Sequence, residues 1–291
     1  MSHSPSEIEQ KRDLLLETLA GYRQVAVAFS AGVDSTVVAK AAFLACGSNS
    51  VAVTAVSLSL AAGEREEAEQ LAALIGIRHL VIQTQEFSDP EYLRNAPNRC
   101  YFCKTELYSR LVELAPSLGI KVLVNGANLD DKGDYRPGMQ AAAQFQVRSP
   151  LIEAGMNKSD VRELARLWNL PVWDKPATPC LSSRIAYGVE VTPERVLRID
   201  RAEHFLKQLM GIGELRVRCE ANDLARIELP LEQVHRMMAP ALRDQVRSHL
   251  REIGFRFVTV DLDGFRSGSM NSALPHEQLL SVQIPTELLS L

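Results

Sequence analysis

The chain has 291 residues, of which 46% are hydrophobic and 23% are charged, with a formal net charge of −4. These values are typical of a soluble globular protein with one large or two ordinary domains. No apolar run reaches membrane-spanning length, and the polar N-terminal stretch has no signal-peptide core. We therefore expect a cytoplasmic protein with no membrane partner, and the acidic balance argues against nucleic acid as its main ligand.

The most informative segment lies near the N-terminus. A helix is predicted over 5–20, a buried strand over 25–29, and an apolar helix over 37–45 that is opened by Asp34, Ser35 and Thr36. Between strand and helix lie the small residues Ser30, Ala31 and Gly32, which permit a tight turn. In such a strand–loop–helix unit the loop amides and the helix dipole point at one spot, so we expect a phosphate site.

The next elements alternate between strand and helix. Strands are predicted over 51–57, 79–83 and 122–125, and helices over 64–75 and 103–118. This alternation predicts an α/β fold with a doubly wound parallel sheet. Ligands of such sheets bind at the carboxyl ends of the strands, where the phosphate loop and the segment Asn125-Gly126-Ala127-Asn128 both fall.

The pattern changes after residue 188. Thr192-Pro193-Glu194 is a strong helix start, and that helix should run to about residue 210. Strands are predicted over 215–219, 224–229 and 255–262, with a mostly helical segment over 233–253. We therefore expect two domains, 1–188 with the parallel sheet and 189–291 as a smaller α+β domain.

Three of the five cysteines lie in polar segments. Cys100 and Cys103 are spaced Cys-x-x-Cys just before a predicted helix, and Cys180 lies in a turn-rich stretch. The residues alone leave three interpretations open: unrelated thiols, a zinc site completed by a histidine, although none lies near in sequence, or an iron–sulfur cluster with one open iron. Cys46 and Cys219 end apolar elements and are expected to be packing residues.

The phosphate loop resembles that of the PP-loop ATP pyrophosphatases, which cleave ATP between the α and β phosphates. Their Ser-Gly-Gly-x-Asp-Ser pattern is matched by Ser30, Gly32, Asp34 and Ser35, with Ala31 in place of the usual glycine. The Gly-Lys-Ser/Thr ending of a Walker A loop is absent. The resemblance implies that ATP phosphates are bound by the loop residues Ser30, Gly32, Val33, Asp34 and Ser35.

Further motifs narrow the resemblance, and nearly the whole chain resembles the LarE-type sulfur insertases. The motifs are Asn125-Gly-Ala-Asn-Leu-Asp-Asp131, Gly133-Asp-Tyr-Arg-Pro-Gly138, Cys180-Leu-Ser-Ser-Arg184 and Ser267-Gly-Ser-Met-Asn271. That family adenylylates a carboxylate of pyridinium-3,5-biscarboxylate mononucleotide and converts it to a thiocarboxylate during nickel-pincer nucleotide synthesis for lactate racemase.

The family has two branches, which differ in the source of sulfur. One sacrifices the sulfur of the cysteine matching Cys180 and leaves dehydroalanine. The other holds a 4Fe-4S cluster through three cysteines and delivers sulfide from it. The set Cys100, Cys103 and Cys180 implies the cluster branch for this chain.

The resemblance also implies roles at the nucleotide site. Asp34 and Asp131 are expected Mg2+ ligands, with loop capping as the alternative for Asp131, and Gly126 lies in the nucleotide-binding segment. Lys104 near the thiolates or Lys175 near the adenylate is expected to stabilise developing negative charge.

Other residues are expected near the substrate. Arg216 and Arg218 lie two apart on a strand and share a face, which suits a phosphate or carboxylates, with a solvated strand face as the alternative. Arg184 and Ser182 beside Cys180 are expected to orient the adenylate. Tyr101 is expected to stack on the pyridinium ring, or else to be a packing residue.

The implied partners are a small-molecule pyridinium nucleotide, a sulfide donor, other enzymes of the cofactor pathway and further copies of the chain in a homo-oligomer. The rival functions are a cluster-dependent tRNA thiolase, an amide-forming PP-loop ligase and a nucleotide-binding regulator without catalysis. A thiolase is expected to carry a basic RNA module and a ligase an ammonia source, and the sequence shows neither.

Overall fold

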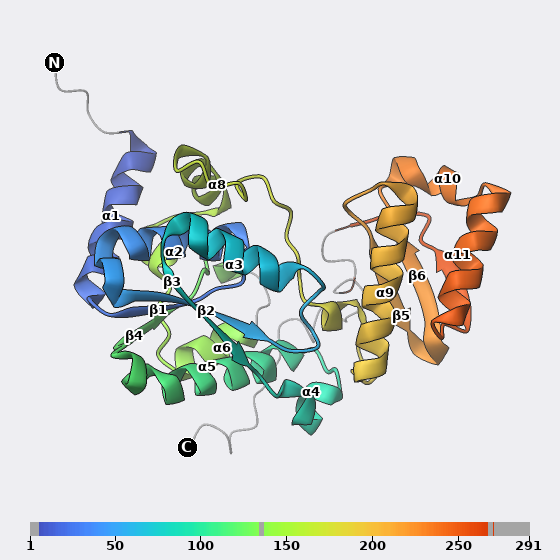
Figure 1. The fold of residues 1–291 in the computed structure, drawn as a ribbon, viewed down its shortest axis with the longest axis horizontal. Coiled ribbons are helices and arrows are strands. Elements are labelled where there is room, and N and C mark those ends of the chain that lie inside the picture. The colour runs from blue at the N-terminus through green and yellow to red at the C-terminus, as the bar shows by residue number, and fades with distance from the viewer. Residues whose placement is uncertain (1–5, 134–136, 267–269, 271–291) are drawn as a thin grey trace. The chain divides into compact units, whose positions relative to one another are not determined.

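The computed structural model describes residues 6–133, 137–266 and 270, and these fold into two compact units (Figure 1). The first unit contains the described residues up to 57 together with 62–86 and 100–178. The second contains 58–61, 87–99 and the described residues from 179 onward. The segments of the two units interleave along the chain, and the domain division expected after residue 188 stays a prediction. Most of the motifs Gly133–Gly138 and Ser267–Asn271 lies outside the described residues.

The first unit is built on a four-stranded sheet. Its strands are β1 (Val25–Ala28), β2 (Ser50–Val56), β3 (Arg78–Gln83) and β4 (Val122–Val124). Its helices are α1 (Glu7–Tyr22), α2 (Val33–Cys46), α3 (Glu64–Ile75), α5 (Arg99–Leu118), α6 (Pro137–Gln144), α7 (Pro150–Glu153) and α8 (Lys158–Leu167), with Arg99 itself assigned to the second unit. Figure 1 shows α2, α3 and α8 on one face of the sheet and α5 and α6 on the other.

The order of the strands fixes where a ligand can bind. The sheet runs β3-β2-β1-β4 and all its neighbours are parallel, which confirms the predicted doubly wound sheet. From β1 the chain first builds outward through β2 and β3, and later returns to pair β4 on the other side of β1. The strand order therefore reverses between β1 and β4, and the crevice at their carboxyl ends is the place where such sheets bind ligands.

Helix α2 is the centre of the hydrophobic core of this unit. Val37, Val38, Ala39, Ala41 and Ala42 are all fully buried, so the helix is covered on nearly every side. Its many alanines let α1, α8 and β1 approach closely, and each of these elements packs against it. The helix begins at Val33 with Gly32 as its N-cap, which is earlier than predicted, so Asp34, Ser35 and Thr36 lie in its first turn.

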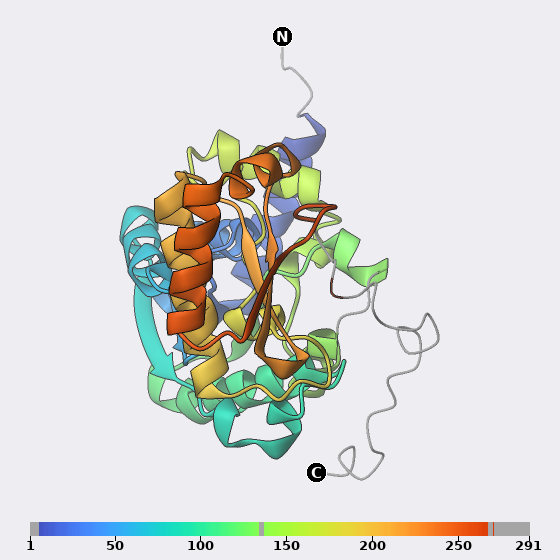
Figure 2. The same cartoon turned by 90° about the vertical axis from the view of Figure 1, so that its right-hand side faces the viewer.

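The second unit has a three-stranded sheet of order β5-β6-β7. The β5–β6 pair is antiparallel and the β6–β7 pair parallel, and α9 and α11 lie together on one side of the sheet (Figure 2). The elements are α4 (Pro90–Leu93), α9 (Pro193–Met210), β5 (Arg216–Glu220), β6 (Leu224–Glu228), α10 (Val234–Met237), α11 (Pro240–Glu252) and β7 (Phe257–Val260).

The start of α9 agrees with the sequence prediction, because the Thr192 side chain accepts a hydrogen bond from the amide of Arg195. The helix predicted over 233–253 is instead divided into α10 and α11. Pro240 is the first residue of α11, where a missing amide hydrogen costs nothing. Among the described residues, no helix is both long and apolar enough to cross a bilayer.

Candidate active site

The loop that follows β1 is a tight turn that leads directly into helix α2. Ala31 has a φ of 57°, in the left-handed region, and Gly32 then caps the fourteen-residue helix α2. The hydroxyl of Ser35 accepts a bond from the Ser30 amide at 3.2 Å and donates to the Gly32 carbonyl at 3.1 Å. These bonds close the loop over the N-terminus of α2, so amides and helix dipole act at the same place.

The segment after β4 packs directly onto this loop. A β-carbon added at Gly126 would lie 2.8 Å from the amide nitrogen of Ser35, so only glycine fits there. Asn125 accepts bonds from the amide of Ala127 at 3.1 Å and from the hydroxyl of Ser149 at 2.9 Å. The structure thus brings together the phosphate loop and the Asn125–Asn128 segment, as the sequence predicted.

Two acidic residues lie at this junction in different settings. Asp34 accepts a bond from the Asn128 side-chain amide at 3.0 Å, and its second oxygen lies 2.5 Å from Lys158 Nζ. Asp131 is 8% exposed and accepts a bond from the Asn128 backbone amide at 2.9 Å. Asp131 therefore caps the Asn128 turn, which was the alternative role considered for it.

Sequence reasoning assigned no role to Lys158 or to Asn128. Lys158 is the first residue of α8, and its backbone amide donates to Asp130 at 3.0 Å. The sequence carried one available signal, the capping box formed by Asn157 and Asp160, which fixes the start of α8. It contained no sign that α8 begins beside the phosphate loop, because Lys158 and Asp34 are 124 residues apart.

The two candidate lysines differ in their surroundings. Lys175 Nζ lies 2.6 Å from a carboxylate oxygen of Glu67 and 3.4 Å from the carbonyl oxygen of Ala31 in the phosphate loop. Lys104 lies on α5, and a β-carbon at Gly138 would come within 3.0 Å of its Cγ. Lys175 therefore contacts the phosphate loop through the Ala31 carbonyl.

Tyr101 is buried on α5 with 3% exposure. Its hydroxyl donates to Gln144 at 2.7 Å, and its ring makes an edge contact with Phe102 at 5.3 Å between centroids. Of the two roles considered for Tyr101, this position supports packing rather than stacking on a ligand.

The cysteines differ in exposure and in their surroundings. Cys100 is exposed and Cys103 and Cys180 are partly exposed, whereas Cys219 is buried and burial raises its pKa to about 11. Cys46 is partly buried, burial raises its pKa, and its thiol donates to the Leu19 carbonyl at 3.2 Å. Cys46 and Cys219 therefore behave as packing residues, in agreement with the sequence prediction.

The Cys-x-x-Cys pair does not precede a helix as predicted. Helix α5 begins at Arg99, so Cys100 and Cys103 lie in its first turn, three residues apart on one face. Both belong to the first unit and Cys180 belongs to the second. Within residues 6–133, 137–266 and 270, no three His, Cys, Asp or Glu side chains form a ready metal site.

In the second unit, the segment around Cys180 is held by buried polar groups. Arg184 is 2% exposed, donates to the carbonyls of Pro179 and Cys180, and pairs with Glu203 at 3.1 Å. The Ser182 hydroxyl is fully buried against the hydroxyl of Tyr92 at 2.7 Å. These contacts fix the backbone of the loop and leave the Cys180 side chain partly exposed.

Arg216 and Arg218 lie on β5 and share a face, and both are buried. Arg218 donates two bonds to one oxygen of Glu228, at 2.9 and 2.7 Å. The guanidinium of Arg216 lies over the ring of Phe265, and burial together with the charge of nearby Arg184 lowers its pKa. The predicted alternative of a solvated strand face is therefore wrong for this pair.

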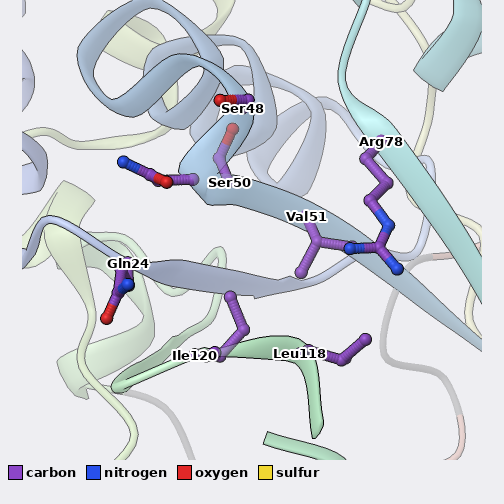
Figure 3. A pocket seen from close by; sticks show the side chains of 9 residues that line it. Gln24, Ser48, Ser50, Val51, Arg78, Leu118 and Ile120 are labelled. Carbon is purple, nitrogen blue, oxygen red and sulfur yellow. The ribbon is translucent and has the colours of Figure 1, made fainter.

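A small hollow lies at the opposite end of the first sheet. Gln24, Val51, Arg78 and Ile120 are among its lining residues, at or near the amino ends of the strands (Figure 3). Its volume is about 50 Å³, which admits a few water molecules and no nucleotide. The carboxyl edge with the phosphate loop remains the candidate site.

Comparison with known proteins identifies relatives that match almost the full chain. An uncharacterised protein of Synechocystis is 46% identical over 92% of this chain and 99% of its own. The pyridinium-3,5-bisthiocarboxylic acid mononucleotide synthase of Lactiplantibacillus plantarum is 38% identical over 92% of this chain and 96% of its own. A tRNA-specific 2-thiouridylase of Azorhizobium caulinodans is 30% identical over 53% of this chain and 49% of its own. No family model matches the chain.

Proposed function

Because the chain belongs to the LarE family of pyridinium-3,5-bisthiocarboxylic acid mononucleotide synthases, we propose that it is an ATP-dependent sulfur insertase acting on a pyridinium-3,5-biscarboxylate mononucleotide. The observation that carries this proposal is the anion-binding loop of residues 30–35 at the switch point of the sheet, in a chain with a full-length relative of that activity. The loop of residues 30–35 supports the use of ATP, and the mononucleotide synthase of Lactiplantibacillus plantarum supports the class of substrate.

The proposed reaction has two steps. A carboxylate oxygen of the substrate attacks the α-phosphorus of ATP, and the bond to the β-phosphate oxygen breaks and releases pyrophosphate. Sulfide then attacks the activated carbonyl carbon, and AMP leaves with the original carboxylate oxygen. Activation is needed because an oxide ion is a poor leaving group, whereas AMP is a good one.

The residues of the first unit suit the first step. The bonds between Ser30, Ser35 and Gly32 hold the loop closed, so the remaining loop amides and the N-terminus of α2 are placed to bind the departing pyrophosphate, and the α2 dipole adds to that attraction. Lys175, next to the Ala31 carbonyl, supplies a cation close to the loop. Asp34 is the carboxylate for Mg2+, which when bound neutralises phosphate charge.

The substrate itself carries a phosphate and two carboxylates. In the second unit Arg184, Arg216 and Arg218 are buried, and Arg184 pairs with Glu203 and Arg218 with Glu228. Burial lowers the pKa of Arg216, and repulsion from nearby Arg184 adds to this shift. We assign this arginine group to the anionic substrate, because a bound anion would relieve that repulsion.

For the sulfur source we propose a 4Fe-4S cluster held by Cys100, Cys103 and Cys180. The three thiols suit a metal cluster better than Cys46 and Cys219, because burial raises the pKa of those two and so disfavours their thiolates. When bound, the cluster would present sulfide on its open iron. The alternative is that Cys180 gives up its own sulfur and becomes dehydroalanine.

The test of function is product formation by purified protein in the absence of oxygen. With ATP, Mg2+, sulfide and the pyridinium biscarboxylate mononucleotide, mass spectrometry should find a nucleotide in which sulfur replaces one oxygen. Each product molecule should appear with one pyrophosphate. When unmodified tRNA replaces the mononucleotide, no pyrophosphate should be released.

The reaction with tRNA as substrate tests a second function. A tRNA thiolase is the rival, because a 2-thiouridylase matches 53% of this chain. Thiolated tRNA together with an inactive mononucleotide reaction would overturn the proposed substrate. A Cys100→Ala variant that keeps multiple turnovers would overturn the cluster and leave the enzyme class intact.

A further inference from the structure

The ion pair between Lys158 and Asp34 lies inside the proposed ATP site. Lys158 Nζ lies 2.5 Å from one oxygen of Asp34, and the other oxygen accepts the Asn128 amide at 3.0 Å. The side chains of Lys158 and Asp34 are 35% and 24% exposed. Both oxygens of this carboxylate are therefore engaged by groups of the protein, one by an amide and one by an ammonium group.

A metal ion on this same oxygen would lie next to the ammonium group of Lys158, and the two positive charges would repel each other at short range. Mg2+ requires oxygen ligands in a tight octahedral shell, usually one or two carboxylates together with substrate phosphates. Any Mg2+ that binds Asp34 must therefore displace Lys158. The displaced ammonium would lie beside a divalent cation, which is unfavourable unless a new anion takes the place of the carboxylate.

We propose that Lys158 occupies the metal's place on Asp34 until ATP binds, and then exchanges Asp34 for the ATP phosphates while Mg2+ takes the carboxylate. This inference rests on the proposed function and deepens it. In the free protein one cation pairs with one carboxylate. In the complex Mg2+ pairs with Asp34 and Lys158 with a phosphate oxygen, so neither cation lacks a counter-charge.

The fold holds the backbone of Lys158 in place and leaves its side chain room to move. Asn157 and Asp160 cap the start of α8 reciprocally, at 3.0 and 2.9 Å, and Lys11 pairs with Asp160 at 2.8 Å. Behind them, Val161 and Leu164 are fully buried. The ammonium is carried on a flexible four-carbon stem, so it can swing without any shift of the helix.

The consequence is cooperative binding of metal and nucleotide. Free metal must break the ion pair between Lys158 and Asp34 and leave Lys158 without a counter-charge. Metal that binds together with ATP brings phosphate oxygens that can pair with Lys158 instead. By linkage, ATP must strengthen metal binding by the same factor by which the metal strengthens ATP binding. The site would thereby bind free Mg2+ weakly and bind the Mg2+–ATP complex tightly.

The experiment measures Mn2+ as a spectroscopic substitute for Mg2+. Electron paramagnetic resonance gives the Mn2+ affinity of the protein with and without a non-hydrolysable ATP analogue. For Lys158→Met we expect nucleotide-free Mn2+ affinity to rise about tenfold and affinity for the analogue to fall about tenfold. The factor by which the ATP analogue strengthens Mn2+ binding should therefore be smaller than in the wild type.

Further variants complete the test. Lys121→Met removes an exposed lysine elsewhere in the first unit and should behave as the wild type. Lys158→Arg keeps the cation, so it should continue to exclude free Mn2+, whereas Lys158→Gln removes the charge and takes the place of the methionine variant if that one does not fold. If the wild type binds Mn2+ with the analogue and removal of the Lys158 charge leaves free Mn2+ affinity unchanged, the inference is wrong and the proposed function stands. If the wild type does not bind Mn2+ with the analogue at all, the proposed function itself fails.

Discussion

Gly126 touches the phosphate loop so closely that an added β-carbon would lie 2.8 Å from the Ser35 amide nitrogen and 3.1 Å from the carbonyl carbon of Asp34. The contact joins the segment after β4 to the first turn of α2, across the point where the strand order reverses. Because both partners are backbone, no side-chain rotation can make room for a larger residue. The geometry of the ATP site thus depends on the absence of one methyl group.

The first prediction concerns this contact. Gly126→Ala should force the two segments apart at a cost of about 1–3 kcal/mol, the usual range for overpacking. ATP affinity should fall by about fivefold to a hundredfold, measured by calorimetry. The matched control is Gly21→Ala in α1, where a β-carbon would meet no atom within 4 Å. Equal ATP affinity in both variants would show that the contact does not shape the site.

The second prediction concerns Ala31, which adopts a left-handed conformation with a φ of 57°. Alanine is strained there by about 1–2 kcal/mol, whereas glycine is not. Glycine also loses about 0.5–1 kcal/mol more conformational entropy on folding. Ala31→Gly should therefore raise the free energy of unfolding by up to about 1 kcal/mol, measured by urea denaturation. A loss of more than about 1 kcal/mol would contradict this conformation of the loop.

The third prediction concerns thiol reactivity in protein freed of metal by a chelator. Burial raises the pKa of Cys219 to about 11, so at pH 8 about one molecule in a thousand carries its thiolate. Iodoacetamide should modify Cys100, Cys103 and Cys180 and spare Cys219, as read by peptide mass spectrometry. Unfolding in urea should make all five cysteines reactive. Native labelling of Cys219 as fast as that of Cys100 would contradict its burial.

The fourth prediction concerns stability in acid. Burial lowers the pKa of His79, and only a weaker effect of Glu69 opposes this shift. His79 lies 2.8 Å from the Thr54 hydroxyl, which donates to the carbonyl of Phe29 just before the phosphate loop. Since the pKa of the folded state is below that of the unfolded chain, the stabilisation is present above about pH 6.5 and is lost as the pH falls.

The variant that tests this effect is His79→Gln, which cannot take up a proton. Its free energy of unfolding should fall less steeply between pH 7 and pH 5 than that of the wild type, by at most about 1.4 kcal/mol per pH unit. His235→Gln, at an exposed position on α10, should leave the slope unchanged. A slope in His79→Gln equal to that of the wild type would show that His79 does not titrate in this range.

The elements that the sequence predicted best carry local signals. Helix α3 has the predicted bounds Glu64–Ile75, since Gly63 and Gly76 border it in left-handed conformations. Helix α9 begins at Pro193, within the helix start predicted from Thr192-Pro193-Glu194. The start of α5 lies four residues before the predicted one, although Asn98, a residue type that often caps helices, directly precedes Arg99. Local signals therefore fix the ends of some helices and not of others.

The site was predicted in part, for a similar reason. The phosphate loop is one continuous segment, so its residues could be recognised together. The contact of Lys158 with Asp34 joins positions 124 residues apart and depends on how α8 packs against α2. The sequence around either residue does not indicate how α8 packs against α2. The buried setting of Tyr101 was undecided for the same reason, because the side chain of Gln144 that it meets comes from another helix.

The central claim is that a substrate carboxylate is activated by AMP before sulfur enters. The most direct measurement uses the pyridinium biscarboxylate mononucleotide with both oxygens of each carboxylate replaced by the heavy oxygen isotope. After turnover with ATP, Mg2+ and sulfide, mass spectrometry of the AMP should find one heavy oxygen per molecule, since AMP leaves with a carboxylate oxygen. Sulfur-containing product accompanied by AMP without the heavy isotope, or by ADP and phosphate, would contradict the account.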